Sequence, residues 1–255
     1  MSESARVLSR TTGVIKRFGT GEHVATVLQA IELEIAAGEL TLLMGPSGSG
    51  KTTLVSILAG LLWPSEGRVE LCGSELPAFD EARAAALRRE HVGFIFQGYN
   101  LFPGMSALDN VALGYRLRGF TRNDARNAAR AALAAVGLAS RAEQRPGKLS
   151  SGQKQRVAIA RALAGEPALV IGDEPTAALD SATAMSVMGL LRERVTPQSG
   201  VLIVTHDVRM QRFAHRTVHI EDGRIVGDER HAAPAAVPDP EKRERRSAVG
   251  AGVQQ

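Results

Sequence analysis

The sequence predicts an α/β fold with a mainly parallel sheet, and three observations support that prediction. Short apolar runs typical of buried strands alternate with helical runs along most of the chain. A glycine-rich loop lies between the apolar run 40–44 and the helical run 54–62, which is a strand–loop–helix arrangement. From residue 98 to about 165 the pattern is almost wholly helical, which indicates a helical subdomain inserted into the α/β core.

The N-terminal part of the chain carries strand signals up to residue 45. Runs at Val7–Ile15 and Val27–Ile35 precede a turn at Gly38, after which the chain enters the strand that feeds the loop. Phe18 lies between the first two runs. Its ring is either ordinary core or a platform on which adenine stacks, because every base offers a π-face.

The glycine-rich loop reads GPSGSGKTT. Its glycines allow the backbone N–H groups to turn inward and form a cradle for phosphates at the start of a helix. Lys51 is placed to reach the β- and γ-phosphates of a bound polyphosphate, and Thr52 to offer a hydroxyl to Mg²⁺. A plain glycine-rich turn is the alternative, and the strand–loop–helix context argues against it. The expected phosphate-binding residues are Gly45, Pro46, Ser47, Gly48, Ser49, Gly50, Lys51, Thr52 and Thr53.

The next elements end in a second candidate residue. Gly67–Gly73 is typical of a short strand and Phe79–Glu90 of a charged amphipathic helix. Val92–Phe96 is a compact apolar strand followed by Gln97. An amide at the C-terminal edge of a parallel strand lies where α/β sheets hold ligands, so Gln97 is a candidate contact to Mg²⁺ or to an attacking water. Considered alone, Gln97 is better interpreted as a solvated loop glutamine.

The helical stretch contains two helices and ends in a second candidate anion site. The runs 106–117 and 122–136 have helical periodicity and recognisable ends. The loop Leu149–Gln153 (LSSGQ) precedes another helical run at 154–164. Ser150 has the cap position and the loop exposes helix N–H groups, which favour anions. A plain serine cap is the alternative.

A buried apolar strand at 167–174 ends in two acids. Burial does not explain carboxylates at that point, because unpaired charges there are costly. Beside a phosphate loop, Asp173 is expected to order Mg²⁺, and Glu174 to polarise a water for attack on the γ-phosphate. Asp180 then opens the helical run 181–195, where simple capping competes with a role in nucleotide binding.

The last apolar strand of the core, 201–204, is followed by His206. A lone histidine is more often structural, but this one ends a strand at the same edge as Gln97 and Asp173, which favours a contact to the γ-phosphate. Within 217–226 an Asp-Gly pair between alternating strands predicts a hairpin.

Composition indicates the cellular compartment and the residue at which the folded part of the chain ends. The 255 residues, 44% of them hydrophobic, suffice for a real core. The single cysteine, Cys72, excludes an intramolecular disulfide and fits a reducing compartment. No apolar run approaches the roughly 18 residues that span a bilayer, and the first residues lack a signal-peptide core, so a cytoplasmic protein is expected. Ala, Pro and charged residues dominate 228–255, which we expect to be a disordered C-terminal tail.

Six motifs occur in the order seen in ATP-binding cassette (ABC) ATPases, a family that the chain resembles over residues 6–227. They are the loop at 45–53, Gln97, LSSGQ at 149–153, VIGDEP at 170–175, AALD at 177–180, and His206. The resemblance implies a P-loop NTPase core with a mainly parallel sheet, an N-terminal antiparallel β subdomain and an inserted α-helical subdomain at about 98–165. Within the family, the chain is most similar to the ATPase subunits of macrolide-export, lipoprotein-release and heterocyst-glycolipid exporters.

The resemblance also implies a role for each candidate residue. ATP and Mg²⁺ are expected between two subunits, a homodimer or pseudo-dimer, with each phosphate loop facing the signature loop of the other subunit. The implied catalytic residues are Glu174, His206, Gln97 and Lys51. The implied metal ligands are Thr52, Gln97 and Asp173. Further nucleotide contacts are implied for Phe18, Asp180 and the signature residues Ser150, Ser151, Gly152 and Gln153.

The implied function is an ATP-hydrolysing subunit that powers a membrane transporter, an exporter, by ATP-driven dimerisation. Transmembrane permease subunits are the expected partners, which would hold the chain at the inner face of the cell membrane. Nucleic acid is not an expected partner. An alternative is an ABC ATPase that transmits mechanical force to a membrane partner without transport, as in the cell-division relatives.

Three positions depart from the family pattern. Ser151 stands where glycine is usual, Gly172 where alanine is common, and Ala177 where serine or glycine is common. Glycine permits backbone geometries that cost serine energy, so Ser151 is expected to weaken or retime closure of the dimer.

Overall fold

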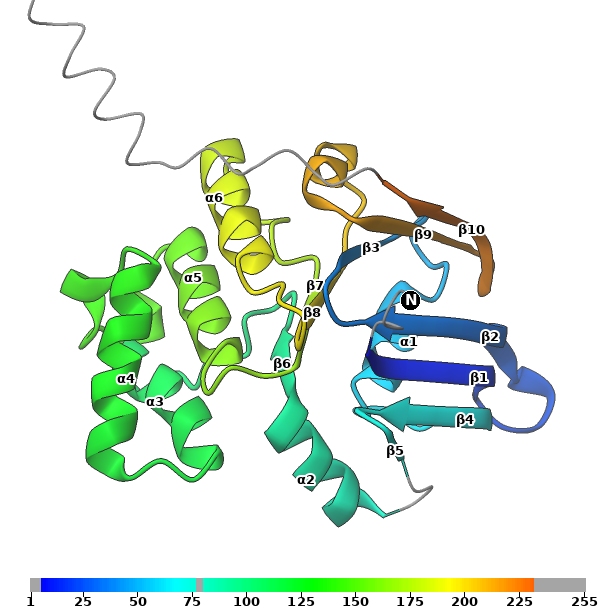
Figure 1. Cartoon of the computed structure of the whole chain (residues 1–255), viewed down its shortest axis with the longest axis horizontal. Coiled ribbons are helices and arrows are strands. Elements are labelled where there is room, and N and C mark those ends of the chain that lie inside the picture. The colour runs from blue at the N-terminus through cyan, green and yellow to red at the C-terminus, as the bar shows by residue number, and fades with distance from the viewer. Residues whose placement is uncertain (1–5, 77–79, 232–255) are drawn as a thin grey trace, which may run out of the picture.

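The computed structural model describes residues 6–76 and 80–231, which form two sheets flanked by helices (Figure 1). One sheet is antiparallel, and the other is parallel except for its edge strand β10. The predicted α/β class with a mainly parallel sheet and an N-terminal antiparallel sheet is therefore confirmed. In the described parts of the chain no helix combines the length and the apolar character needed to cross a bilayer.

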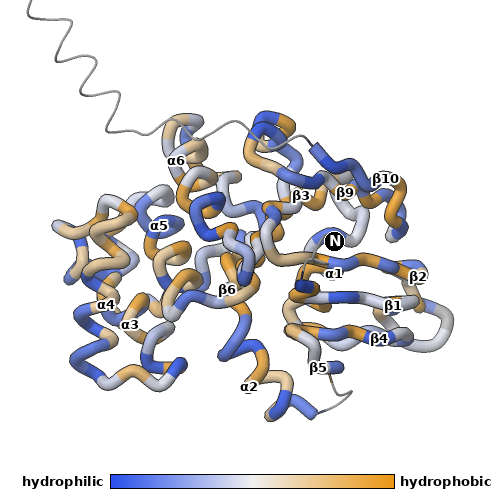
Figure 2. Tube along the Cα trace, in the orientation of Figure 1, coloured by the Kyte–Doolittle hydropathy of each residue, from blue (hydrophilic) through white to orange (hydrophobic). Residues whose placement is uncertain are grey.

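The antiparallel sheet has the strand order β2-β1-β4-β5. Its strands are β1 (Val7–Phe18), β2 (Ala25–Ala36), β4 (Glu66–Leu71) and β5 (Ser74–Glu75). Hydrophobic and hydrophilic stretches alternate along β1, β2 and β4 in Figure 2. That alternation is expected when one face of a sheet is buried and the other meets water.

The second sheet has the order β10-β9-β3-β8-β7-β6. Its strands are β3 (Leu40–Met44), β6 (Val92–Ile95), β7 (Leu169–Asp173), β8 (Gly200–Val204), β9 (Arg216–Glu221) and β10 (Arg224–Arg230). Every residue of β3, β7 and β8 is buried, as expected for inner parallel strands covered on both faces. The helices are α1 (Lys51–Leu58), α2 (Glu81–His91), α3 (Ala107–Leu117), α4 (Arg122–Ala135), α5 (Ser151–Ala162) and α6 (Ser181–Arg192).

The two faces of the parallel sheet have separate cores. On β3, Leu43 packs with α1 and with the buried side of the antiparallel sheet. Leu40 and Leu42 point to the opposite face and pack with residues of α5, α6 and the 3₁₀ helix Val208–Phe213. The alternation along one strand therefore fixes the phosphate loop, which follows β3, between two packed layers.

A third core lies within α3, α4 and α5, on the side of the molecule away from the antiparallel sheet (Figure 1). Ser106 caps α3 by accepting a hydrogen bond from the Asp109 N–H, and Thr121 caps α4 in the same way. The predicted helices 106–117 and 122–136 therefore agree with the structure to within one residue. Smaller 3₁₀ turns at Gly21–His23, Ala139–Arg141 and Pro146–Lys148 connect elements.

Several predicted boundaries differ from the structure: β1 continues past residue 15 to Phe18, α1 begins at Lys51 rather than at 54, and α5 begins at Ser151 rather than at 154. The helix expected at 79–90 begins at Glu81, because the Asp80 side chain caps it, and residue 79 lies outside the described residues. Strand β10 continues to Arg230, which is paired with Arg216, so a tail starting at residue 228 is wrong at its first residues. The remainder of the predicted tail, 232–255, lies outside the described residues.

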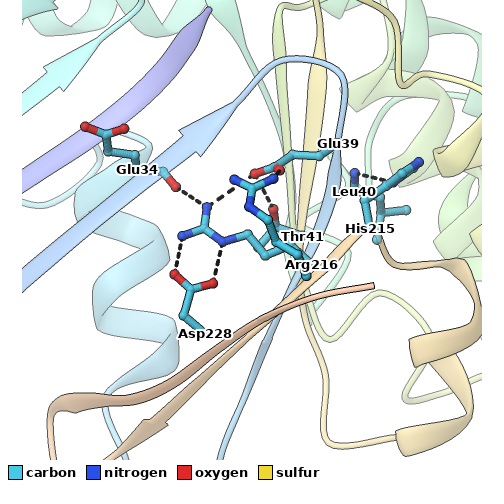
Figure 3. A network of polar contacts seen from close by, with 8 residues as sticks. Glu34, Glu39, Leu40, Thr41, His215, Arg216 and Asp228 are labelled. Carbon is cyan, nitrogen blue, oxygen red and sulfur yellow. Dashed lines mark hydrogen bonds and ion pairs between the residues drawn. The ribbon is translucent and has the colours of Figure 1, made fainter. Parts of the chain in front are cut away.

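An ionic network around the buried Arg216 and Glu39 explains why β10 extends that far (Figure 3). Arg216 on β9 donates two hydrogen bonds of 2.7 Å to the Asp228 carboxylate and a third to the Glu34 carbonyl oxygen. Glu39, at the entry to β3, is 5% exposed and lies 3.3 Å from Arg216 and 2.9 Å from Arg230. Hydrogen bonding to Arg216 lowers the pKa of Asp228. The network joins β2, β3, β9 and β10.

Candidate active site

A pocket with a volume of about 740 Å³ opens at the C-terminal ends of β3, β7 and β8. Parallel α/β sheets bind ligands at this edge, because the loops that follow the strands gather there. The lining residues are Val27, Gly45, Pro46, Ser47, Gly48, Gly50, Lys51, Thr52, Thr53, Gln97, Asp173, Glu174, Val204 and His206. One pocket thus brings together most of the residues that the sequence predicts for phosphate, metal and catalysis.

The phosphate loop turns directly into α1. Gly50 has φ +98° and occupies the cap position of α1, and a side-chain carbon there would lie 2.8 Å from a methyl of Leu28. The Lys51 ammonium group donates hydrogen bonds to the carbonyl oxygens of Gly45 at 2.8 Å and Pro46 at 2.6 Å. The cation is therefore folded across the loop, and the α1 N-terminus supplies further N–H groups to the same pocket.

Asp173 ends β7 at the floor of the pocket and is 6% exposed. Burial raises the pKa of Asp173, and a hydrogen bond from the Thr52 hydroxyl opposes that rise. Glu174 raises the pKa further and Lys51 lowers it. A desolvated carboxylate beside a hydroxyl is an oxygen-rich position at which a cation is favoured.

Glu174 is held in an unusual backbone conformation. Its φ is +49°, in the left-handed region that non-glycine residues rarely adopt, and its N–H donates to the Val204 carbonyl oxygen at 3.0 Å. The side chain lies 2.9 Å from Nδ1 of His206. The sequence predicted both residues at this edge but not their direct contact, which depends on how β7 and β8 lie side by side.

Gln97 follows β6 and lines the same pocket. The loop after it is built by Tyr99 and Asn100, both with positive φ, of +62° and +47°. Arg161 on α5 donates hydrogen bonds to both of their carbonyl oxygens, and burial lowers the pKa of its guanidinium. This arginine ties the Gln97 loop to the helix that begins at Ser151.

The same loop exposes an apolar side chain at a fixed position. Asn110 is fully buried and exchanges hydrogen bonds with the backbone of Phe102, accepting from its N–H at 2.8 Å and donating to its oxygen at 3.1 Å. The amide also donates to the carbonyl oxygens of Met105 and Ser106. With its backbone held, Phe102 is 49% exposed.

Seven predicted nucleotide contacts do not line this pocket; they are Phe18, Ser49, Ser150, Ser151, Gly152, Gln153 and Asp180. Phe18 is 43% exposed, and its ring lies 4.9 Å from the Lys16 ammonium group. Ser49 belongs to the loop, but its side chain is buried. Asp180 caps α6 through the Thr183 N–H, and its hydrogen bonds to Thr183 lower its pKa. Within one chain, Asp180 therefore acts as a helix cap, which was the alternative interpretation of this residue.

The signature residues form a reciprocal cap at the start of α5. Ser150 accepts a hydrogen bond from the Gln153 N–H at 3.3 Å, and the Gln153 side chain accepts one from the Ser150 N–H at 3.0 Å. Ser150 and Ser151 are exposed to solvent. Exposed helix N–H groups on a surface outside the pocket are available to a ligand carried by a second molecule.

Two pocket residues, Val27 and Val204, were not predicted. Each lies in a strand that the sequence did predict, but an apolar residue there looks the same whether it faces a core or a ligand. A second pocket of about 360 Å³ adjoins the first and shares Glu174 and His206 with it. Arg209 borders this second pocket and is bound to Asp207 and Ser181.

Comparison with known proteins relates the chain to ATP-binding proteins of transporters. The family described as ABC transporter matches residues 28–177. The macrolide export ATP-binding/permease protein MacB 1/2 of Paracoccus denitrificans is 46% identical over 240 residues, covering 94% of this chain and 36% of the relative. The lipoprotein-releasing system ATP-binding protein LolD of Chromohalobacter salexigens is 42% identical over 224 residues, covering 87% of this chain and 94% of the relative.

Among solved structures, the chain resembles the ATP-binding cassette MJ0796 in a dimeric post-hydrolysis state bound to ADP and Pi. The TM-score is 0.83 at 36% identity, and the match covers 88% of this chain and 98% of that one. The chain spans about a third of the length of the macrolide-export relatives that it matches.

Proposed function

Because the chain belongs to the ABC transporter family and has its ATP-hydrolysing cassette, we propose that it powers a membrane exporter through ATP-driven pairing of two cassettes. The observation that carries this proposal is the pocket in which the phosphate loop, Asp173, Glu174 and His206 meet at one sheet edge. Each of these groups has a distinct task in the transfer of a γ-phosphoryl group to water.

The pocket fits ATP. Its volume of about 740 Å³ lies within the range of small-molecule sites, roughly 300–1,000 Å³. Glycines at 45, 48 and 50 leave room for phosphate oxygens beside the backbone, and the α1 N-terminus and Lys51 supply positive potential. Lys51 exchanges the Gly45 and Pro46 carbonyl oxygens for phosphate oxygens, which are stronger partners because they are charged.

The donor set fits Mg²⁺. Thr52, Gln97 and Asp173 offer a hydroxyl, an amide oxygen and a carboxylate to the same pocket, and Mg²⁺ prefers oxygen ligands. Phosphate oxygens and waters complete the shell of Mg²⁺ in sites of this type. Bound there, Mg²⁺ would neutralise negative charge on the phosphates.

Glu174 is the residue that we assign to the attacking water. Its carboxylate accepts a hydrogen bond from that water and draws away its proton as the oxygen attacks phosphorus. His206 holds the carboxylate from one side at 2.9 Å, and the backbone bond to Val204 fixes its starting point. Gln97 faces the same space and can orient the water or the metal.

In this proposal, a second cassette supplies the signature residues, which do not line the pocket of their own chain. Ser150, Ser151 and Gly152 lie at the N-terminus of α5, with Ser150 and Ser151 exposed. In a pair of cassettes these N–H groups and hydroxyls contact the γ-phosphate held by the partner. The similarity to MJ0796, which is dimeric and bound to ADP and Pi, supports the pairing of two cassettes.

Transmembrane permease subunits are the partners that we assign to the Gln97 loop, and they would keep the chain at the inner face of the cell membrane. In this loop the exposed Phe102 has the half-buried Tyr99, Leu101 and Met105 near it in the chain, and contiguous apolar patches mark interaction sites. Asn110 and Arg161 hold this loop rigidly enough to transmit a movement from the nucleotide pocket. The relatives' names, macrolide export and lipoprotein release, support the exporter branch.

Co-purification from membranes tests this assignment. We expect the tagged chain to bring polytopic membrane proteins with it from solubilised membranes, identified by mass spectrometry. Phe102→Asp should abolish that association while ATP hydrolysis by the isolated chain persists. Val226→Asp is the matched control, since Val226 is 60% exposed on β10 and faces no proposed partner. A Phe102→Asp chain that still brings its membrane partners contradicts the docking site.

A further inference from the structure

The phosphate loop rests against a turn that lies far away in the sequence. Asp222 and Gly223 connect β9 to β10, and the Gly223 N–H donates a hydrogen bond to the Ser49 carbonyl oxygen at 3.2 Å. The end of β9 contacts the start of the loop as well. A side-chain carbon on Gly45 would lie 3.1 Å from the Ile220 carbonyl carbon and closer still to its oxygen. The hairpin therefore supports the glycine-rich loop at its start, Gly45, and at its middle, Ser49.

Gln29 on β2 clamps the turn. Its N–H donates to the Gly223 carbonyl oxygen at 2.8 Å, and its side-chain amide donates to the Asp222 carbonyl oxygen at 2.9 Å. Arg224 in turn donates to the Gln29 side-chain oxygen at 2.6 Å. Three hydrogen bonds thus hold the turn against the strand whose Val27 lines the pocket.

The place of the turn against β2 requires glycine at position 223. Gly223 is buried and has φ +72°, a left-handed conformation that glycine adopts without strain. An added side-chain carbon would lie 3.0 Å from the Val27 carbonyl carbon and 3.2 Å from the Leu28 Cα. Both neighbours are backbone atoms, so the turn itself would have to move, and its bond to Ser49 would be lost.

Ser49 depends on support from outside the loop. It is 3% exposed, and its hydroxyl has no hydrogen-bond partner among the residues that the structure describes. Its N–H bonds within the loop, to the Pro46 carbonyl oxygen at 3.3 Å. The Gly223 N–H fixes the carbonyl at the other side of the same residue, and hence the plane of the peptide between Ser49 and Gly50.

We propose that the Asp222–Gly223 turn is a positioning element for phosphate binding, which keeps the loop's N–H groups turned toward the pocket. The proposal rests on the function above, in which the loop binds the phosphates of ATP. A cradle of N–H groups attracts an anion only while its peptide planes are aligned, and alignment before binding lowers the entropy cost of binding. The C-terminal hairpin thereby acts on nucleotide affinity without touching the nucleotide.

The chain contains a matched control for this turn. Gly73 lies between β4 and β5 with φ +80°, next to Cys72 with φ +49°. Asp222 and Gly223 have nearly the same pair of angles, +46° and +72°. A side-chain carbon on Gly73 would meet no atom within 4 Å. Alanine therefore adds similar backbone strain in both turns but displaces only the one beside the phosphate loop.

The test is titration of the full chain with MgATP, together with steady-state ATPase kinetics. We expect Gly223→Ala to weaken ATP binding about tenfold, the scale of one to two lost hydrogen bonds. KM should rise while kcat at saturating ATP changes by less than about threefold, because the turn does not touch the reacting atoms. Gly73→Ala should bind ATP as the wild type does. Gln29→Ala, which removes the two side-chain hydrogen bonds of the clamp, keeps the one from the backbone N–H and adds no atoms, should weaken binding by about threefold or more.

Two results overturn the proposal. One is equal ATP affinity in Gly223→Ala and Gly73→Ala, since any loss would then follow from strain alone. The other is wild-type affinity in Gln29→Ala, which also decides the matter if Gly223→Ala does not fold. A wild-type chain that fails to bind MgATP contradicts the proposed function instead. If the wild type binds MgATP normally and Gly223→Ala and Gln29→Ala bind it equally well, only the role of the turn is contradicted, and the proposed function stands.

Discussion

Lys51 shows how one side chain determines the chemistry of the phosphate loop. It is the first residue of α1, it is 9% exposed, and its ammonium group bonds to two loop carbonyl oxygens. A cation this close to the loop raises the attraction for an anion where water is largely excluded.

Replacing this cation should remove most of the affinity for ATP. Lys51→Ala deletes charge-assisted hydrogen bonds worth about 1.5–3 kcal/mol each, so we expect ATP binding to weaken by more than about tenfold. Lys148→Ala, at an exposed lysine outside the pocket, removes the same charge from the molecule and should bind ATP normally. Equal binding by the two variants in calorimetric titration contradicts the assignment.

The positions of single residues were the part most accessible from the sequence. Asp173 ends an apolar strand, Glu174, His206 and Gln97 follow one, and parallel strands bring such residues to one edge. Strand pairing is not readable in this way, so the contact between Glu174 and His206 was missed. The positive φ of Glu174 was also missed, since nothing in its side chain indicates it.

At the scale of elements, β9 and β10 connect the C-terminal part of the fold to the strand that feeds the loop. His215 precedes β9, and its Nδ1 accepts a hydrogen bond of 2.9 Å from the Leu40 N–H at the start of β3 (Figure 3). Only an unprotonated Nδ1 can accept that bond. Burial lowers the pKa of His215, the charge of Arg192 lowers it further, and Glu39 opposes both.

This histidine should make stability fall in mild acid. A lowered pKa in the folded state means that stability is present above the unfolded value of about 6.5 and is lost as pH falls through the folded pKa. We expect the free energy of unfolding in urea to drop between pH 7.5 and 5. In His215→Asn that drop should be smaller, because the other five histidines are common to both proteins. Identical slopes for the two proteins contradict the role of His215.

The end of β10 gives a second prediction for an element. Removing 228–255 deletes Asp228 and Arg230, which leaves the buried Arg216 and Glu39 without two of their partners. We expect this truncation to cost about 2 kcal/mol more than removal of 232–255, a value reduced for the exposure of the deleted side chains. Chemical denaturation of the two truncated chains measures the difference. Equal stabilities contradict a structural role for the network.

Local signals and long-range contacts differ in how far the sequence predicted them. The cap position of Ser150 and the Asp-Gly turn were predicted correctly, and capping was one of the two interpretations of Asp180, because each involves residues close together in the chain. The extension of β10 and the contact of Gly223 with Ser49 join distant segments. These contacts depend on which strands pair, and the sequence pattern does not determine that pairing.

At the scale of the whole molecule, the proposed pair of cassettes has its own signature. When hydrolysis is blocked in Glu174→Gln, ATP bridges the loop of one copy and Ser150 of the other, so the chain should elute as a dimer only with ATP. Adding Ser150→Arg places a bulky side chain at that contact and should restore the monomer. Size-exclusion chromatography measures both. A double variant that dimerises as fully as Glu174→Gln contradicts the contact between subunits.

The central claim is that the pocket around Glu174 hydrolyses ATP. The most direct measurement is phosphate release by the purified full chain, with ATP binding determined on the same samples. Glu174→Gln keeps the shape of the side chain but removes the carboxylate that draws the proton from water. We predict near-normal ATP binding with phosphate release lowered by about 100-fold or more, the range of a lost general base. Phosphate release at the wild-type rate by Glu174→Gln would contradict the account.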